Sequence, residues 1–557
     1  MKNISFFKSI ILLILATNFL SAAEPFKNGV VVSVSQPGSD AGLAILKSGG
    51  NAVDAAIATA FALAVTHPAA GNIGGGGFMV VHPPAGKGEP TIFEYREMAP
   101  KATFETIYKK NDGMFTHKVS GVPGTVRGMA LAHQRFGSKP WASLILPAIE
   151  LADKGFPVSK QLANSLNGLL STSKEFAELQ RVFKPTGQRN VWQAGDILVQ
   201  KELGKTLERI AKYGPDEFYL GETADLINNE MKSGKGLISK EDLSNYQARE
   251  RKPIRIDYKG YSIYGPPSPS SGTITLGLML NMIEPTNIAK MGRWSPETLH
   301  LLIETMKHAF SERARHIGDQ GFVDIPESLL KKEFARELAA KLDLKKAIPS
   351  IEIAKEIPIS KESDDTTHFS VVDGQGMAVS NTYTLEQSYG SKVMVKGAGF
   401  LLNNEMLDFN WFPGETTTSG RVGTAPNLIK PGKKMISSQT PVIVAKDGVP
   451  HIVTGSPGSR TIINTVFNII VNIIDFQMDA QKAVDAARLH HQWFPDKAYF
   501  EEANNPMHES AMKKLRDMGH NITTRRQGDA HTILIDLKTK LLHPGLDHRI
   551  EGGLAGY

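Results

Sequence analysis

The chain has 557 residues, of which 41% are hydrophobic and 22% are charged. This length allows three or four domains or fewer large ones, and the composition excludes a largely disordered or fibrous protein. Cysteine is absent, which excludes disulfides, thiolate metal sites, iron–sulfur clusters and a cysteine nucleophile. The net charge of +6 is not concentrated in any block of five basic residues, which argues against a nucleic-acid partner.

The first 23 residues have the pattern of a secretory signal peptide. Lys2 and Lys8 precede an apolar run over residues 10–16, and the small residues Ser21 and Ala23 stand at positions −3 and −1 of a cleavage site. A membrane anchor is the alternative, but the apolar run is shorter than the ~20 residues that a crossing helix requires. We expect residues 1–23 to be removed and the mature protein to be periplasmic or secreted, with no membrane anchor.

The first half of the chain mixes helical periodicity with short strands. Helices are predicted over residues 42–66, 125–135, 203–213 and 297–315. A glycine run at 71–77 follows the first of them and precedes a strand. A dinucleotide site needs the order strand, glycines, helix, so this run predicts close packing of backbones and not phosphate binding.

The second half changes character after a charged segment with two prolines, residues 345–365, which we interpret as an exposed connector. Beyond it, three hairpins are predicted, 368–372 with 377–384, 442–445 with 451–454, and 532–536 with 541–543. Helices are predicted over 459–476, 480–488 and 509–518. Hairpins alternating with helices predict an α+β fold in which helices cover the sheets.

Two polar patterns in this half have structural interpretations. Asn464, Asn468 and Asn472 lie along one stripe of an otherwise apolar helix, which favours a buried core helix over a membrane span. His490 and His491 are adjacent, so their side chains point to opposite sides of a strand, and no HExxH motif accompanies them. We therefore expect no metal site.

A pair of threonines, Thr366 and Thr367, follows the connector and opens a predicted strand. Threonine is a common strand residue, so the pair alone is ambiguous. A chemical route exists if the peptide bond before Thr366 is cut, because Thr366 then gains a free α-amine. That amine titrates at about 7.7–8.0 and can act near neutral pH as general base for the hydroxyl of the same residue.

Several motifs together define a resemblance. They are TTHFSVVD at 366–373, YTL at 383–385, FLLNNEMLDF at 400–409, ISSQTP at 436–441 and TGSPG at 454–458, preceded by GNIGGGGFMV, FEYREMAP, SGVPGTVRG and PPSPSSG and followed by the C-terminal GLAGY. In this order, and over essentially the whole mature chain, the motifs resemble the γ-glutamyltransferase (γ-glutamyltranspeptidase) family of N-terminal-nucleophile hydrolases. The resemblance implies a four-layer αββα sandwich.

The resemblance also implies self-cleavage between Asp365 and Thr366, giving a large subunit of 24–365 and a small subunit of 366–557. The hydroxyl of Thr366 would then attack the γ-carbonyl of a γ-glutamyl substrate and form an acyl-enzyme. Thr384 matches the threonine that supports this nucleophile, although an ordinary strand threonine is the alternative. Gly458 and the backbone N–H of Ser459 match the oxyanion hole.

The substrate side follows from the same match. Arg96 matches the arginine that binds the α-carboxylate, and Ser437 and Ser438 match hydroxyl donors to the same group. Asp408 matches the acid that binds the α-amine, with Glu405 as its companion.

This chain departs from the family pattern in three places. Glu386 stands where well-known members have an asparagine that contacts the α-groups of the substrate, and the three departures together put acceptor choice and the ratio of hydrolysis to transfer in doubt. Gly458 is followed by Ser459 where a double glycine is usual. The segment after Asp408, residues 409–414, has the position of a lid but contains no tyrosine.

The sequence thus predicts an exported, self-cleaving γ-glutamyltransferase and glutathione hydrolase. Its donors would be glutathione, glutamine or related γ-glutamyl amides, and its acceptors water, amino acids or peptides. No metal or organic cofactor is expected. The rival enzyme is an acylase of the same fold that cleaves glutaryl-type amides, which lack the α-amine. The rival from another class is an uncut binding protein that has kept the fold and lost the chemistry.

Overall fold

The computed structural model describes residues 24–185, 189–357, 359–361 and 366–557. The predicted signal peptide, 1–23, and Asp365 of the predicted cleavage site lie outside the described residues. In the described part, none of the helices combines the length and apolar character that a membrane crossing requires.

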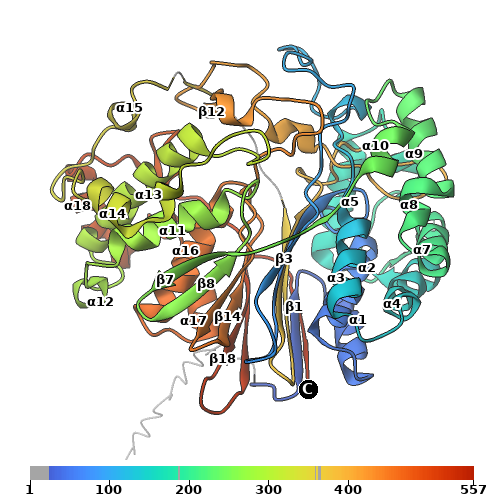
Figure 1. Ribbon diagram of the computed structural model, residues 1–557, viewed down its shortest axis with the longest axis horizontal. Helices are drawn as coiled ribbons and strands as arrows, with labels where there is room; N and C mark the ends of the chain where they lie inside the picture. The colour runs from blue at the N-terminus through green and yellow to red at the C-terminus, as the bar shows by residue number, and fades with distance from the viewer. Residues whose placement is uncertain (1–23, 186–188, 358, 362–365) are drawn as a thin grey trace, which may run out of the picture.

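Two antiparallel sheets form the centre of the molecule (Figure 1). Within the described residues, the first sheet has the order β20-β1-β10-β11-β2-β3-β6 and the second β19-β18-β14-β13-β8-β7. The first comprises β1 (Gly29–Ser33), β2 (Gly76–His82), β3 (Thr91–Glu94), β6 (Arg249–Arg251), β10 (Thr367–Asp373), β11 (Ala378–Thr384) and β20 (Gly553–Gly556). The second comprises β7 (Ile254–Tyr258), β8 (Tyr261–Gly265), β13 (Val442–Lys446), β14 (Val449–Thr454), β18 (His531–Ile535) and β19 (Leu542–Leu546).

Side chains on the inner face of each sheet pack against the other sheet. Val30 and Val32 of β1 pack with Ile443 and Ile533 of the second sheet, whereas Val31 between them packs with the helices on the opposite face. Successive residues of a strand point to opposite faces, so a strand that is covered on both sides is apolar at every position. The fully buried sequence of β1 therefore indicates that its sheet is covered on both faces.

Helices cover the outer face of each sheet, with α1–α10 against the first and α11–α18 against the second (Figure 1). The first layer contains α1 (Gln36–Lys47), α2 (Ala52–Thr66), α3 (Thr125–Phe136), α4 (Trp141–Lys154), α5 (Lys160–Thr172), α6 (Ala177–Val182), α7 (Lys201–Tyr213), α8 (Asp216–Leu220), α9 (Glu222–Ser233) and α10 (Lys240–Asn245). The second contains α11 (Gly272–Ile283), α12 (Ile288–Met291), α13 (Pro296–His316), α14 (Lys332–Ala339), α15 (Ser350–Ile353), α16 (Thr461–Ile474), α17 (Ala480–Asp485) and α18 (Glu509–Asp517). The predicted α+β, four-layer αββα architecture is confirmed.

Short strands pair with one another in the loops around these layers. They are β4 (Phe156–Pro157), β5 (Ile197–Leu198), β9 (Ile359–Lys361), β12 (Gly420–Val422), β15 (Leu489–His490), β16 (Ala498–Phe500) and β17 (Ile522–Thr523). The three predicted hairpins are confirmed as β10–β11, β13–β14 and β18–β19. The asparagine stripe is also confirmed as part of a buried helix, α16, where Asn468 and Asn472 accept hydrogen bonds from the guanidinium of Arg293 at 2.7 and 2.6 Å.

One prediction about local structure is wrong and another holds only in part. The single helix predicted over 42–66 is two helices, because α1 ends at Lys47 and Gly49 takes a left-handed φ of 85° before Asn51 caps α2. The segment 345–365 is not exposed throughout. It contains α15, in which Ser350 is buried. The backbone carbonyl of Ser350 accepts a hydrogen bond from the indole N–H of Trp493 at 2.9 Å.

Candidate active site

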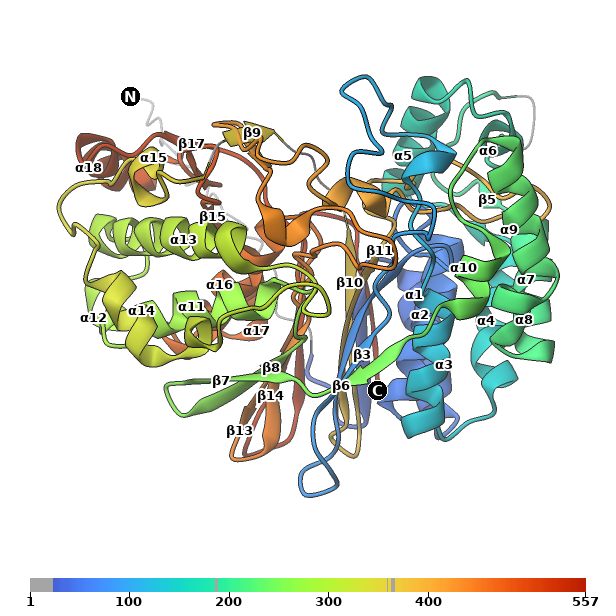
Figure 2. The ribbon, with the colours of Figure 1, turned by 45° about the horizontal axis from the view of Figure 1, so that its top comes forward.

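The middle of the first sheet positions the predicted nucleophile. Thr366 lies immediately before β10, and Figure 2 shows β10 and β11 at the centre of the molecule between the two helical layers. The strands pair antiparallel with Thr367 opposite Tyr383, so the register continues to Thr366 opposite Thr384. Thr366 is half-buried, whereas Thr384 is buried and its hydroxyl accepts a hydrogen bond from the backbone N–H of Glu386 at 2.9 Å. The two predicted catalytic threonines therefore share one end of a hairpin.

The predicted packing role of the glycine run is confirmed beside this hairpin. A Cβ atom on Gly75 would lie 2.0 Å from the carbonyl oxygen of Thr384, a distance at which no side chain fits. Asn72 reinforces the contact, because its side-chain amide donates to the same carbonyl at 2.9 Å. The glycines thus let β2 approach β11 closely and fix the backbone of Thr384.

The predicted oxyanion turn lies between β14 and α16. Gly458 has a φ of 119°, and a Cβ there would lie 2.4 Å from the hydroxyl of Thr461, so the turn requires glycine at this position. Ser459 also has a left-handed φ, 49°, which costs a non-glycine residue roughly 1–2 kcal/mol. A second glycine would adopt this conformation without that cost, which explains physically why a double glycine suits the turn.

The predicted substrate residues form a second cluster around Arg96. Its buried guanidinium donates hydrogen bonds to Glu405 and Asp408 and to the carbonyl of Ile436, the last at 3.1 Å. Glu97 adds a third carboxylate at 3.4 Å. Burial raises the pKa of Glu405 well above its usual range and the pKa of Glu97 to about 7, although the positive charge of Arg96 opposes both shifts. The fold thus joins residues that are more than 300 positions apart.

Ser437 and Ser438 follow Ile436 and so lie next to this cluster. The hydroxyl oxygen of Ser437 accepts from the backbone N–H of Gln439 at 3.1 Å, and that of Ser438 accepts from Arg313 at 3.1 Å. A hollow of about 20 Å³ is lined by Arg313, Asp408, Ser438 and Ser459, among others. It has room for about one water molecule, so a larger group must displace side chains to enter.

A much larger cavity, of about 700 Å³, borders the predicted nucleophile. Its lining includes Thr366 and Gly458 together with His67, Arg526, Asp529 and Glu551. Burial, followed by the effect of His531, lowers the pKa of His67 to about 4, so this ring is neutral near pH 7. The sequence alone does not identify His67, Arg526, Asp529, Glu551 or Arg313. These residues come from separate loops and helix ends, and no local motif connects them.

The family profile described as Gamma-glutamyltranspeptidase matches residues 38–557.

The chain belongs to the γ-glutamyltranspeptidase family.

Curated relatives extend over nearly the whole chain. It is 40% identical to the glutathione hydrolase proenzyme of Escherichia coli K12, with 95% of this chain and 92% of the relative aligned. It is 41% identical to the glutathione hydrolase proenzyme of Pseudomonas aeruginosa, with 94% of each chain aligned. The acylase ACY 1 proenzyme of a Pseudomonas species is 36% identical over 83% of this chain and 82% of its own length.

Solved structures agree with the fold. A cephalosporin acylase from Bacillus halodurans has a TM-score of 0.86 at 26% identity and covers 98% of this chain and 99% of its own. The γ-glutamyltranspeptidase of Pseudomonas nitroreducens, complexed with L-DON, has a TM-score of 0.53 at 40% identity. That alignment covers 56% of this chain and 94% of the solved one.

The predicted lid position of this γ-glutamyltranspeptidase family member is packed against the body of the protein. Trp411 stacks on Tyr108 with ring centroids 4.0 Å apart and planes 10° apart, and its indole N–H donates to the carbonyl of Met406 at 2.7 Å. The segment is thus held by a stacking contact with a residue about 300 positions earlier in the chain.

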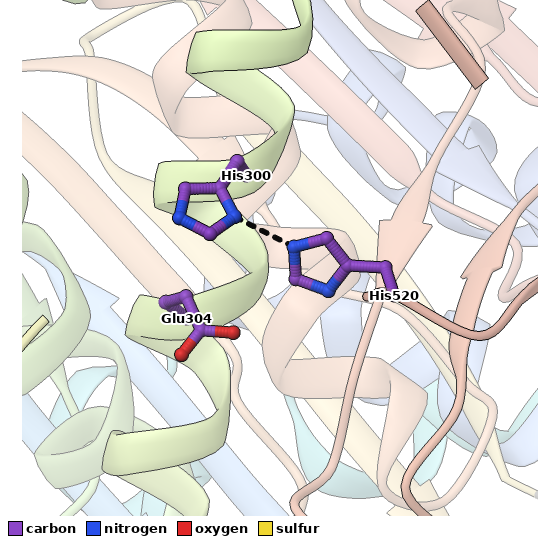
Figure 3. Close-up of side chains that lie close together, drawn as sticks. All are labelled: His300, Glu304 and His520. Atoms are coloured by element: carbon purple, nitrogen blue, oxygen red, sulfur yellow. Dashed lines mark hydrogen bonds between the residues drawn. The ribbon is translucent and has the colours of Figure 1, made fainter. Parts of the chain in front are cut away.

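A histidine–carboxylate cluster outside the site has the spacing of a metal centre but a different bonding pattern. The ligand atoms of His300, Glu304 and His520 lie within 4.8 Å of one another (Figure 3). His300 Nε2 contacts the carbonyl of Asp343 at 2.7 Å, so it carries the proton, and Nδ1 accepts from His520 Nε2 at 2.7 Å. Lys307 Nζ lies 2.9 Å from Glu304 and neutralises the carboxylate. The donor set therefore fits a hydrogen-bonded cross-link between α13 and the segment after α18 better than a cation.

This cross-link predicts acid sensitivity. Burial, and then the neighbouring His300 and Lys307, lower the pKa of His520 to about 3 from the 6.5 of an unfolded chain. The unfolded state then binds the extra proton below pH 6.5, so stability is complete above that pH and declines as pH falls toward 3, by about 1.4 kcal/mol per pH unit. We expect the variant His520→Gln to reduce the slope of unfolding free energy against pH by about that amount between pH 6 and 4.

Urea denaturation of the protein over this pH range measures the slope. The control is His548→Gln, since His548 is 48% exposed and lies at the surface. Equal slopes for wild type and His520→Gln would contradict a buried, neutral His520.

Proposed function

We propose that the chain is a self-cleaving γ-glutamyltransferase and glutathione hydrolase. The observation that carries this proposal is the position of Thr366, which lies immediately before a central strand, next to the Thr367–Tyr383 pair, and at the border of the large cavity. Membership of the family, and relatives named glutathione hydrolase proenzyme at about 40% identity, support the same activity.

Cleavage between Asp365 and Thr366 gives the proposed subunits 24–365 and 366–557. The topology supports a stable product, because β10 of the small subunit pairs with β1 of the large one, and β20 pairs with β1 on the other side. The two pieces thus share one sheet and stay together after the cut. The solved γ-glutamyltranspeptidase chain that aligns with only 56% of this chain, yet over 94% of its own length, is of the size expected for one such piece.

The proposed reaction uses the amine that the cut exposes. The α-amine of Thr366 takes the proton from its own Oγ, which bonds to the γ-carbonyl carbon of the donor. Backbone N–H groups of Gly458 and Ser459 stabilise the oxyanion, and Thr384 supports the nucleophile. The C–N bond breaks as the leaving amine takes the proton. Water or an acceptor amine then attacks the ester carbonyl carbon and gives a proton to the α-amine, and this proton passes to Oγ as the ester C–O bond breaks.

Donor recognition is assigned to the Arg96 cluster. In this proposal Arg96, Ser437 and Ser438 bind the α-carboxylate, and Asp408 with Glu405 binds the α-amine. The large cavity then receives the leaving group and the acceptor, because its lining includes Thr366 and Gly458, whereas Asp408 lines the small hollow. Substrates are glutathione, glutamine or similar amides, with water, amino acids or peptides as acceptors and no cofactor in any step.

Export is proposed from the sequence of residues 1–23 alone, with the mature enzyme periplasmic or secreted. N-terminal sequencing of the purified protein tests both proposed cuts at once. We expect two sequences, one starting near Glu24 and one starting at Thr366. A single sequence without a Thr366 start contradicts self-cleavage and favours the uncut binding protein.

A second candidate function is favoured by the acylase relatives, which are similar over most of the chain. An acylase for glutaryl amides does not need the α-amine, whereas the proposed enzyme does. Comparing γ-glutamyl and glutaryl anilides therefore separates them. We expect kcat/KM at least about 10-fold higher for the γ-glutamyl compound, because a charge-assisted contact contributes about 1.5–3 kcal/mol. A preference for the glutaryl compound would favour the acylase.

Glu386 gives a further prediction. It is buried, two residues beyond Thr384, with a left-handed φ of 78° that asparagine also tolerates. We expect Glu386→Asn to remove one acid near the amine-binding groups and to change KM for γ-glutamyl anilide by about 3- to 10-fold, with an altered pH profile between pH 5 and 9. Steady-state kinetics of this variant and of the exposed-site control Glu509→Gln measure the effect. An unchanged profile places Glu386 outside the site.

A further inference from the structure

Arg313 is a buried cation that the family resemblance does not assign. It lies in the last turn of α13 and is 7% exposed. Its Nε donates to the hydroxyl of Ser271 at 2.8 Å, and its Nη2 donates to the hydroxyl of Ser438 at 3.1 Å. Both partners are neutral. Across the part of the chain that the structure describes, no carboxylate oxygen lies within the 4.0 Å ion-pair distance of its guanidinium.

Arg96 is in the opposite situation. Its guanidinium already donates to Glu405 and Asp408. A zwitterionic donor brings one carboxylate and one ammonium group to this region. If Asp408 receives the ammonium while Arg96 keeps its bond to Glu405, the incoming carboxylate needs a cation that no acid neutralises. Arg313 is such a cation.

The directions of the hydrogen bonds around Arg313 also favour a carboxylate as the ligand. A guanidinium only donates, so Ser438 Oγ accepts from Arg313 and its own proton must be directed elsewhere. Ser271 uses both functions of its hydroxyl, because it accepts from Arg313 and donates to the carbonyl of Ser437 at 2.7 Å. Arg313 thus fixes the Ser437–Ser438 segment twice, once at a side chain and once at the backbone.

The proposed position of the carboxylate is the small hollow beside these groups, which must widen to admit it. Arg313 and Ser438 line it together with Asp408 and Ser459. The guanidinium, the Ser438 side chain and the proposed amine-binding acid therefore border one space. Burial lowers the pKa of Arg313 to about 10, against the attraction of Asp408, so the side chain is still charged at neutral pH.

We infer that Arg313 is the second cation of the α-carboxylate subsite and that it orients the Ser438 hydroxyl toward the carboxylate. The inference rests on the proposed function, since it names how that site recognises one end of a γ-glutamyl donor. Arg96 binds the carboxylate and also holds the acids that receive the ammonium group, and Arg313 with Ser438 supplies the second set of donors to the carboxylate. The chemical class recognised is an α-amino acid whose side chain carries the scissile amide.

The test compares two anilide donors on wild type, Arg313→Met and Arg313→Lys. The first donor is γ-glutamyl anilide, and the second is 4-aminobutanoyl anilide, which is the same acyl group without the α-carboxylate. For Arg313→Met we expect KM for the first donor to rise about 10- to 100-fold, and kcat/KM for the second to change less than about 3-fold. Arg313→Lys keeps the charge and should recover part of the KM.

Arg209→Met is the matched control, because Arg209 is a partly buried arginine of α7 that pairs with Glu217 at 2.9 Å on the other side of the molecule. Equal losses on both donors, or no rise in KM on γ-glutamyl anilide, overturn the inference. If Arg313→Met does not fold, Ser438→Ala and Arg313→Lys carry the same comparison of donors. A wild type that is inactive on γ-glutamyl anilide overturns the proposed function instead.

Discussion

Replacing Thr366 by alanine is expected to leave the chain uncut and to reduce turnover of γ-glutamyl anilide by about 10⁴-fold or more. Alanine removes the hydroxyl that attacks in both reactions, and without the cut no α-amine forms beside it. Gel electrophoresis of the purified protein reports the cut, and the anilide assay reports turnover. A chain that is cleaved between residues 365 and 366 and active without this hydroxyl would falsify the proposed mechanism.

Two further variants distinguish the loss of the reacting hydroxyl from misfolding at this position. Thr366→Ser keeps a hydroxyl and an α-amine, so we expect it to cleave and turn over, more slowly than wild type. Thr367→Ala changes the neighbouring buried residue of β10, which also borders the large cavity. We expect that variant to be cleaved. Loss of cleavage in all three would indicate that the start of β10 is misfolded.

Replacing Arg96 by alanine is expected to raise KM for γ-glutamyl anilide by about 100-fold. The guanidinium is fully buried and bonded to Glu405 and Asp408, so its removal leaves two acids without their cation and disorganises the amine-binding side. Removing one partner of a buried ion pair also destabilises a protein by about 3–5 kcal/mol. We therefore expect a lower melting temperature as well, with the cut between the subunits still made.

Arg96→Lys tests the geometry of this contact. Lysine keeps the charge but lacks the fork that reaches two carboxylates at once, so we expect a KM between those of wild type and Arg96→Ala. The control is Arg127→Ala, because Arg127 pairs with an Asp216 side chain that is 65% exposed. Unchanged KM in Arg96→Ala, with cleavage intact, argues that the α-groups of the donor bind elsewhere.

Local sequence patterns predicted the elements that depend on interactions between residues close in the chain. The β10–β11 hairpin was predicted because alternating side chains flank Asp373-Gly374-Gln375-Gly376, and turn chemistry of this kind acts over a few residues. The break between α1 and α2 was missed because apolar residues continue on both sides of Gly49. Burial of Ser350 was missed because its partner, Trp493, is over 140 residues away.

The site shows the same division. Thr366, Thr384 and Gly458 were identified from contiguous motifs, and the structure brings the two threonines to one end of a hairpin. Arg313 was not identified, because the run Ser311-Glu312-Arg313-Ala314-Arg315 has the composition of a solvated helix end. Its relation to Ser438 exists only once α13 packs against the 436–438 segment.

By itself, the sequence determined the order of helices and strands in the second half, the candidate nucleophile and the family, because these depend on short patterns and on motifs kept in order. Only the tertiary structure decided that Arg96 pairs with two acids, that Arg313 pairs with none among the residues the structure describes, and that Thr366 borders a large cavity. Charge balance and cavity shape depend on which distant segments become neighbours, and side-chain spacing along a chain does not encode that.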